Sequence, residues 1–196
     1  MARIRTVAAA AATLLLTLTA CSEADAPTTP VDAPSAPATA ALLAEHGLDD
    51  MTGKEMVDHL DRLGGTDRPA DLMASVRAEQ LLLTDGTEEI SVDLPAEEFY
   101  VSVAPYVDQT HECYYHSLTT CQGELVGQDI DVTLTSADGE VLVEETTATQ
   151  PNGFVGYWLP RGFEGTLEVS YEGYTGEVPI ATGAEDPTCI TTLQLT

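Results

Sequence analysis

The strongest constraint on the fold of this chain is the pattern of residues 79–196, where short apolar segments alternate with turn residues. In residues 130–135, Ile, Val and Leu alternate with Asp and Thr, as in a strand with one buried face. Asp138-Gly139 follows and is typical of a hairpin turn, and Asn152-Gly153 repeats that signal. The region therefore predicts about eight mainly antiparallel strands, the last at 190–195, in a β-sandwich or barrel-like domain.

Residues 41–78 show a helical period instead. Thr52-x-x-Glu55 is a capping box, and apolar residues on one stripe follow it between positions 56 and 63. A second helix is expected over residues 69–76, because proline is favoured in a first helical turn. The chain is thus expected to be α+β, with an N-terminal helical segment packed on the β-rich domain.

One histidine of this helical segment could have a function. His59 lies between Asp58 and Asp61, so both a metal site and a solvated helix face fit the pattern. Charged residues grouped on a helix usually form a solvated face. We therefore favour the solvated face for these three residues.

The N-terminal residues are typical of an export signal. Residues 1–5 are basic, and the apolar run at 6–19 is shorter than the roughly 20 residues of a membrane-spanning helix. The run ends in Leu-Thr-Ala-Cys21, a lipobox pattern, so residues 1–20 are expected to be a signal peptide and Cys21 to be lipid-modified. The alternative is an ordinary signal peptide with an incidental cysteine. Proline-rich residues 21–40 are expected to form a disordered, lipid-anchored linker on the extracytoplasmic face of the cell membrane.

Charge excludes several classes of protein. The chain has seven Lys and Arg residues and 33 Asp and Glu residues, which gives a formal net charge of −26. Nucleic-acid binding needs basic side chains that displace counterions from phosphates, so no nucleic-acid partner is expected. Patterns typical of ATP-driven enzymes and serine hydrolases are lacking. We expect no enzyme activity beyond a reduction of Cu(II) by thiols.

The chemistry-bearing residues concentrate in one stretch and one distant cysteine. The candidates are His111, Cys113, His116, Cys121 and Cys189. Three thiols is an odd number, so a wholly structural disulfide framework would leave one unpaired. If residues 110–116 are extended, His111 shares a face with Cys113, which favours His111 over His116 as a ligand.

Three interpretations of these thiols remain open from spacing alone. Thiolates are soft donors, so three of them suit Cu(I), and a histidine in addition would suit Zn(II). A Cys113–Cys121 disulfide would instead leave Cys189 as a buried apolar residue in a structural β module. The same pair could also act in thiol–disulfide exchange or reduce Cu(II).

Four blocks of sequence together resemble the CueP family of exported bacterial copper-binding proteins. They cover residues 99–106, 110–125, 152–160 and 187–195, and the similarity extends over roughly residues 45–196. The three characteristic cysteines of that family fall on Cys113, Cys121 and Cys189. The lipobox is a departure, because soluble periplasmic members lack such a tether.

The resemblance implies that residues 79–196 form a copper-binding domain that holds Cu(I) on the three cysteines. His111 and His116 are further candidate ligands, for Cu(II) also, and zinc is the less favoured metal. It implies a role in copper tolerance and homeostasis, or copper delivery to an exported enzyme such as a copper–zinc superoxide dismutase. It also implies Cu(II) reduction, with a thiol reductant as a further partner.

Overall fold

The computed structural model describes residues 36–196. The expected signal peptide, the lipidation candidate Cys21 and most of the expected linker lie outside these residues. The helical elements of the described part are α1 (Ala36–Glu45), α2 (Gly53–Asp61) and the 3-10 turn η1 (Gly65–Asp67). The strands are β1 (Met73–Val76), β2 (Gln80–Thr84), β3 (Glu89–Asp93), β4 (Glu98–Val103), β5 (Asp129–Ser136), β6 (Val141–Ala148), β7 (Val155–Pro160), β8 (Glu164–Tyr171), β9 (Tyr174–Ala181) and β10 (Cys189–Ile190).

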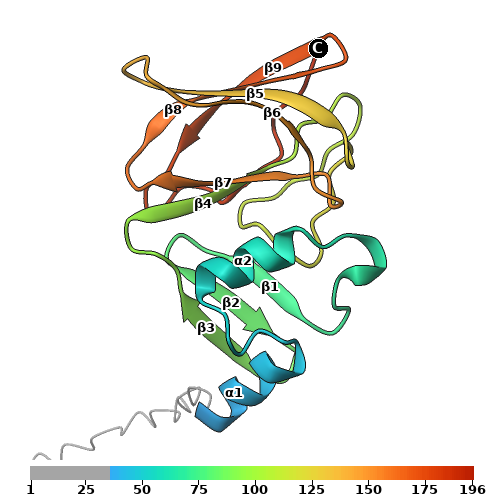
Figure 1. The fold of residues 1–196 in the computed structure, drawn as a ribbon, viewed down its shortest axis with the longest axis vertical. Coiled ribbons are helices and arrows are strands. Elements are labelled where there is room, and N and C mark those ends of the chain that lie inside the picture. The colour runs from blue at the N-terminus through green and yellow to red at the C-terminus, as the bar shows by residue number, and fades with distance from the viewer. Residues whose placement is uncertain (1–35) are drawn as a thin grey trace, which may run out of the picture. The chain divides into compact units, whose positions relative to one another are not determined.

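The strands form three sheets, with orders β1-β2-β3, β10-β4-β7 and β6-β5-β8-β9 (Figure 1). Every pairing between strands is antiparallel except that of β10 with β4. The predicted α+β class is confirmed, and no sheet of residues 36–196 closes into a barrel. Neither helix of the described part has the length and apolar character that a membrane crossing requires.

Strand β4 separates two hydrophobic cores. Its residues Phe99, Val101 and Val103 face a core shared with the four-stranded sheet β6-β5-β8-β9. Tyr100 points the opposite way, into a core formed by α2 and the sheet β1-β2-β3. Because successive side chains of a strand point to opposite faces, one strand can serve both cores. The candidate functional residues gather beyond the end of this strand, around Ala104.

The predicted capping box at the start of α2 is confirmed. The Thr52 hydroxyl accepts from the backbone N–H of Glu55, and the Glu55 carboxylate accepts from the backbone N–H of Thr52. The predicted linker is too long at its C-terminal end, because α1 already begins at Ala36 in an alanine-rich segment with high helix propensity.

The predicted second helix is wrong, because its last residues form strand β1. Leu72, Ala74 and Val76 are buried while Met73 between them is exposed, so the side chains follow a period of two. This segment pairs with β2 in antiparallel register. Pairing in a sheet thus outweighed the weak helical spacing of the apolar residues.

The two predicted turns have different outcomes. Asp138-Gly139 closes the hairpin between β5 and β6, with Gly139 at φ +87°. Asn152-Gly153 also forms a turn, but it joins β6 to β7, which belong to different sheets. The predicted last strand is wrong in length, since β10 covers only Cys189–Ile190. Tyr106 and Gln194 continue the parallel contact as an isolated bridge, which substitutes for a longer strand.

Candidate metal centre

The long connection between β4 and β5, which we call the cysteine loop (residues 104–128), carries four of the five candidates. It is attached to the edge of β1 by backbone hydrogen bonds. The N–H of Val76 donates to the carbonyl of His116 at 2.8 Å, and the N–H of Leu118 donates to Ala74 at 2.9 Å. A buried stretch of loop must satisfy its backbone groups in this way. The attachment fixes residues 116–118 beside the sheet β1-β2-β3.

The far side of the loop touches the turn before β7. The N–H of Gly123 donates to the carbonyl of Asn152 at 2.7 Å. A Cβ on Gly123 would lie 2.4 Å from the Gly153 carbonyl oxygen, so only glycine permits this approach. The contact holds Cys121 next to Phe154, with which it shares a small buried cluster.

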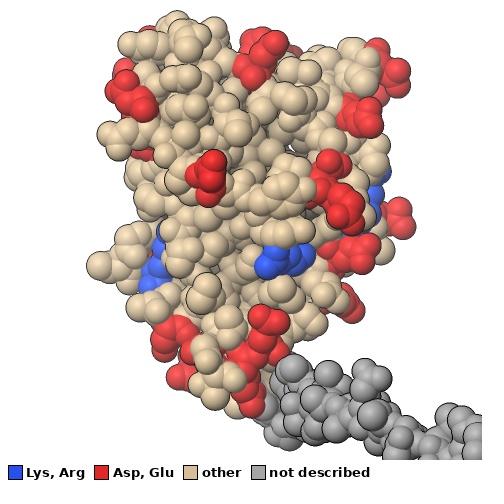
Figure 2. Space-filling model, turned by 180° about the vertical axis from the view of Figure 1, so that it is seen from behind, with Lys and Arg blue, Asp and Glu red and all other residues tan. Residues whose placement is uncertain are grey.

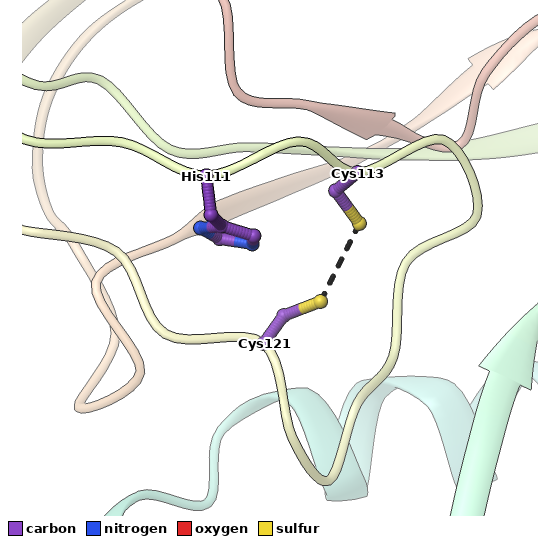
Figure 3. A group of neighbouring side chains, drawn as sticks. All are labelled: His111, Cys113 and Cys121. Carbon is purple, nitrogen blue, oxygen red and sulfur yellow. Dashed lines mark hydrogen bonds between the residues drawn. The ribbon is translucent and has the colours of Figure 1, made fainter.

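The structure brings the three cysteines together, although Cys189 lies far along the chain. The sulfurs of Cys113 and Cys121 are 3.4 Å apart (Figure 3), longer than the roughly 2.05 Å of a disulfide. The two sulfurs therefore form no disulfide in this structure. Cys113 is half-buried, while Cys121 and Cys189 are 9% and 2% exposed.

Ligand atoms form two overlapping groups among residues 36–196 that could hold a metal ion. We call His111, Cys113 and Cys121 the outer group, and His116, Cys121 and Cys189 the inner group. Within each group the ligand atoms lie within 4.8 Å of one another. All five sequence-predicted candidates thus fall into two groups that share Cys121.

The two histidines occupy very different surroundings. His111 is exposed, and its ring points into the space between the two loop segments that carry Cys113 and Cys121 (Figure 3). His116 is fully buried. The centroid of its ring lies 4.5 Å from that of Phe154, and its Nδ1 lies 3.7 Å from the Cys189 sulfur. Both histidines lie beside thiols, so burial rather than proximity distinguishes them.

A buried carboxylate lies behind His116, and sequence reasoning missed it. Asp61, the last residue of α2, accepts a hydrogen bond from Nε2 of His116 at 2.7 Å. The expectation of a solvated face is wrong for Asp61, which is 3% exposed. The signal was its position one turn after Val57, on the same stripe as the apolar residues.

Three further side chains hold that carboxylate. The hydroxyls of Tyr100 and Ser102 both donate to Oδ2 of Asp61, the latter at 3.4 Å. The amide of Asn152 donates to Oδ1 at 2.9 Å and to the Asp61 carbonyl at 2.8 Å. The turn that the sequence indicated at Asn152 therefore also supports the site.

These contacts shift the pKa values of His116 and Asp61. Burial alone would lower the pKa of His116, but hydrogen bonds to Asp61 and to the thiols of Cys113 and Cys121 raise it well above its ordinary value. Burial opposes a charged Asp61, yet its bond with His116 brings the pKa of this carboxyl below the usual value. Both shifts favour the charged forms of the pair, so a metal ion that binds Nδ1 of His116 must first displace the proton there.

The thiols are affected in opposite directions. Hydrogen bonds from Cys113 and Cys189 lower the pKa of Cys121 far below the usual thiol value, against the effect of burial. The contacts with Cys113 and Cys121 raise the pKa of Cys189 strongly. These shifts favour a thiolate on Cys121 and a protonated thiol on Cys189.

Solvent reaches the outer group, whereas His116 and Cys189 of the inner group are buried. An open cavity of about 650 Å³ is lined by His111, Cys121 and Glu124, among others. A second cavity of about 480 Å³ is lined by His111 and Cys113. Acidic side chains are scattered over the face seen in Figure 2 and gather in no single patch.

Known proteins resemble this chain in sequence and structure. A family model described as "Periplasmic copper-binding protein CueP" matches residues 55–194. A solved structure titled "Crystal Structure of S.CueP" is 41% identical, with a TM-score of 0.78, and the match covers 83% of this chain and 100% of that one. No curated protein matches the chain significantly. From the family match and the shared structure, the chain belongs to the CueP family of periplasmic copper-binding proteins.

Proposed function

We propose that this protein captures copper as Cu(I) outside the cytoplasm, on the thiols of Cys113, Cys121 and Cys189. Captured copper would serve copper tolerance or delivery to an exported copper enzyme. The observation that carries the proposal is the thiol cluster itself. The Cys113 and Cys121 sulfurs lie 3.4 Å apart, and the ligand atoms of His116, Cys121 and Cys189 lie within 4.8 Å of one another.

The donor set favours Cu(I) over harder or larger ions. Thiolate sulfur is a soft ligand, which Cu(I) prefers, and three sulfurs satisfy its low coordination number. Zinc would also accept these donors, but it takes four ligands in tetrahedral geometry at structural sites. The expected preference is therefore for Cu(I), with His116 or His111 as an additional nitrogen donor.

The two overlapping groups support a path for the ion. The outer group lines both open cavities, so an arriving ion meets His111, Cys113 and Cys121 first. Cys121 also belongs to the buried inner group, so the ion can exchange ligands without leaving the sulfur of Cys121. Burial beside Cys189 and His116 would then exclude water and slow the loss of the ion.

A Cu(I) titration tests the proposal. The reduced protein is titrated with Cu(I) in the absence of oxygen against a competing chelator, and free thiols are counted in parallel. About one tightly bound Cu(I) with all three thiols protected is the expected result. Failure to compete for Cu(I), with a Cys113–Cys121 bridge forming at once in air, would instead indicate a structural β module.

Reduction of Cu(II) is a second candidate function, favoured by the short Cys113–Cys121 distance. Closing a disulfide between Cys113 and Cys121 releases two electrons and the protons that the two sulfurs carry, and each electron reduces one Cu(II) to Cu(I). Bond formation requires the sulfurs to approach by roughly 1.4 Å, a small movement for a loop. A thiol reductant would then have to restore the pair.

Stoichiometry tests this second function. Addition of Cu(II) to the reduced protein should yield two Cu(I) for each disulfide formed, measured with a Cu(I)-specific chromophore and by mass spectrometry. Cys113→Ser should abolish the disulfide. A bridge that resists glutathione would argue against repeated turnover, because the protein could act only once.

Attachment to the membrane through Cys21 and transfer to a client complete the proposal. The lipobox pattern supports the anchor, which would restrict delivery to clients near the membrane surface. Membrane fractions should hold the wild-type protein, and Cys21→Ala should release it or block its maturation. Incubation of the Cu(I)-loaded protein with a metal-free copper–zinc superoxide dismutase should restore dismutase activity if that enzyme is a client.

A further inference from the structure

We infer that Asp61 is a positioning residue for the copper site, which fixes the ring of His116 so that Nδ1 faces the thiols. This inference rests on the proposed function and extends it to a helix that carries no ligand. Asp61 closes α2 and precedes His116 by 55 positions, so no local pattern links the two.

The two ring nitrogens of His116 have different partners. Nε2 lies 2.7 Å from Oδ1 of Asp61, and Nδ1 lies 3.7 Å from the Cys189 sulfur. A carboxylate can only accept, so the hydrogen of a neutral His116 must lie on Nε2. The lone pair of Nδ1 is then directed at the thiol cluster. Carboxylates commonly orient metal-binding histidines in this way.

Several buried groups hold the Asp61 carboxylate by hydrogen bonds. A buried carboxylate is costly unless it is paired and hydrogen-bonded. Tyr100 and Ser102 donate to one oxygen, and Asn152 and His116 donate to the other. Because the carboxylate is fixed from all sides, it fixes the ring in turn.

The remaining contacts of His116 leave the ring little freedom. Its backbone N–H donates to the Thr188 hydroxyl at 3.0 Å, and its ring packs at 4.5 Å from the Phe154 ring. A ring flip would put the carbon Cε1 in place of Nε2 and the carbon Cδ2 in place of Nδ1, and so break the bond with Asp61 inside a buried site. The orientation seen here is therefore the one available to an arriving ion.

Substitutions at Asp61 test the inference through Cu(I) affinity. Asp61→Ala removes the acceptor and should weaken Cu(I) binding about 10-fold to 100-fold, the usual cost of losing a partner of a metal ligand. Asp61→Asn preserves the shape of the side chain and one, weaker, acceptor oxygen. This variant should therefore fold even if the alanine variant does not, and its Cu(I) affinity should fall by a smaller factor. Asp58→Asn is the matched control on the same helix, where Asp58 accepts from Trp158 Nε1 at 2.8 Å, and its affinity should not change.

A double-mutant cycle separates positioning from a merely structural role. In a His116→Gln background, Asp61→Asn should change Cu(I) affinity less than about twofold, because its effect passes through the ring. The same loss in both backgrounds would overturn the inference. Wild-type affinity in both Asp61 variants would overturn it too.

Nitrogen-15 NMR of the metal-free protein gives a readout independent of copper. At a pH where the ring is neutral, His116 should carry its hydrogen on Nε2 in the wild type and populate both tautomers in Asp61→Ala. A hydrogen on Nδ1 in the wild type would overturn the inference. Wild-type protein that binds no Cu(I) would overturn the proposed function itself, whatever the tautomer, so the two failures are distinguishable.

Discussion

The inner and outer groups of the site share one sulfur but differ in almost every other respect. The inner group is buried and rests on a helix end, on β10 and on hydrogen bonds among buried side chains. The outer group lies on the cysteine loop and borders open cavities. A preorganised inner side can retain an ion, and an accessible outer side can receive it. In the proposed function, one cluster would therefore combine capture with retention.

The outer group nevertheless has its own support. The Glu124 carboxylate accepts hydrogen bonds from three consecutive backbone N–H groups, those of Val107, Asp108 and Gln109, the shortest at 2.7 Å. These bonds hold residues 107–109, at the start of the cysteine loop, against Glu124 near its end. They are exposed or only partly buried, so they constrain the outer group less than the buried network constrains His116.

Loss of the shared sulfur should have the largest effect. Cys121→Ser removes a ligand from both groups and should weaken Cu(I) binding about 1000-fold, or about 4 kcal/mol. The measurement is anaerobic competition with a Cu(I) chelator. Binding within tenfold of the wild type would mean that the two groups do not share this sulfur functionally.

The unshared thiols should differ from each other. Cys189→Ser removes a buried sulfur and should cost about 100-fold in Cu(I) affinity, whereas Cys113→Ser should cost about tenfold. Cys113→Ser should in addition slow Cu(I) uptake in stopped-flow measurements, because it changes the receiving side. Equal losses in affinity and rate would remove the distinction between the groups.

The pH dependence of alkylation should identify the thiolate. Because hydrogen bonds from Cys113 and Cys189 lower the pKa of Cys121, it should remain a thiolate as the pH falls. Between pH 7.5 and 5.5 an ordinary thiol loses about 100-fold in iodoacetamide reactivity, and Cys121 should lose less than about twofold. Tandem mass spectrometry of the metal-free, reduced protein can locate the label, with the urea-unfolded protein as the reference.

The support of the outer loop should give the smallest effect. Glu124→Gln should lower the free energy of unfolding by about 1 kcal/mol, because charge-assisted bonds to backbone N–H groups become neutral. Slight burial opposes ionisation, but these bonds bring the pKa of Glu124 below its usual value. Its stabilisation is therefore present above the unfolded pKa and lost as the pH falls through the folded one. Hydrogen exchange at residues 107–109 should report both changes, with Glu112→Gln as the control.

Local patterns determined most elements of this fold and the identity of the candidate residues. The capping box of α2, the hairpin at Asp138-Gly139 and most strands of residues 79–196 followed from the sequence, because turn chemistry and side-chain alternation act over a few residues. The cysteines and histidines could be named as candidate ligands from the sequence, because their donor chemistry is independent of the fold.

Tertiary structure decided which of these pieces meet. Helical spacing and strand alternation competed in residues 69–76, and pairing with β2 selected the strand. The parallel contact of β10 with β4 placed Cys189 beside the cysteine loop, a pairing that no local signal specifies. Asp61 resembled a surface carboxylate until the packing of α2 directed it at His116. Sequence alone could name the donors, but the burial and distance that give them different roles depend on packing between segments far apart in the chain.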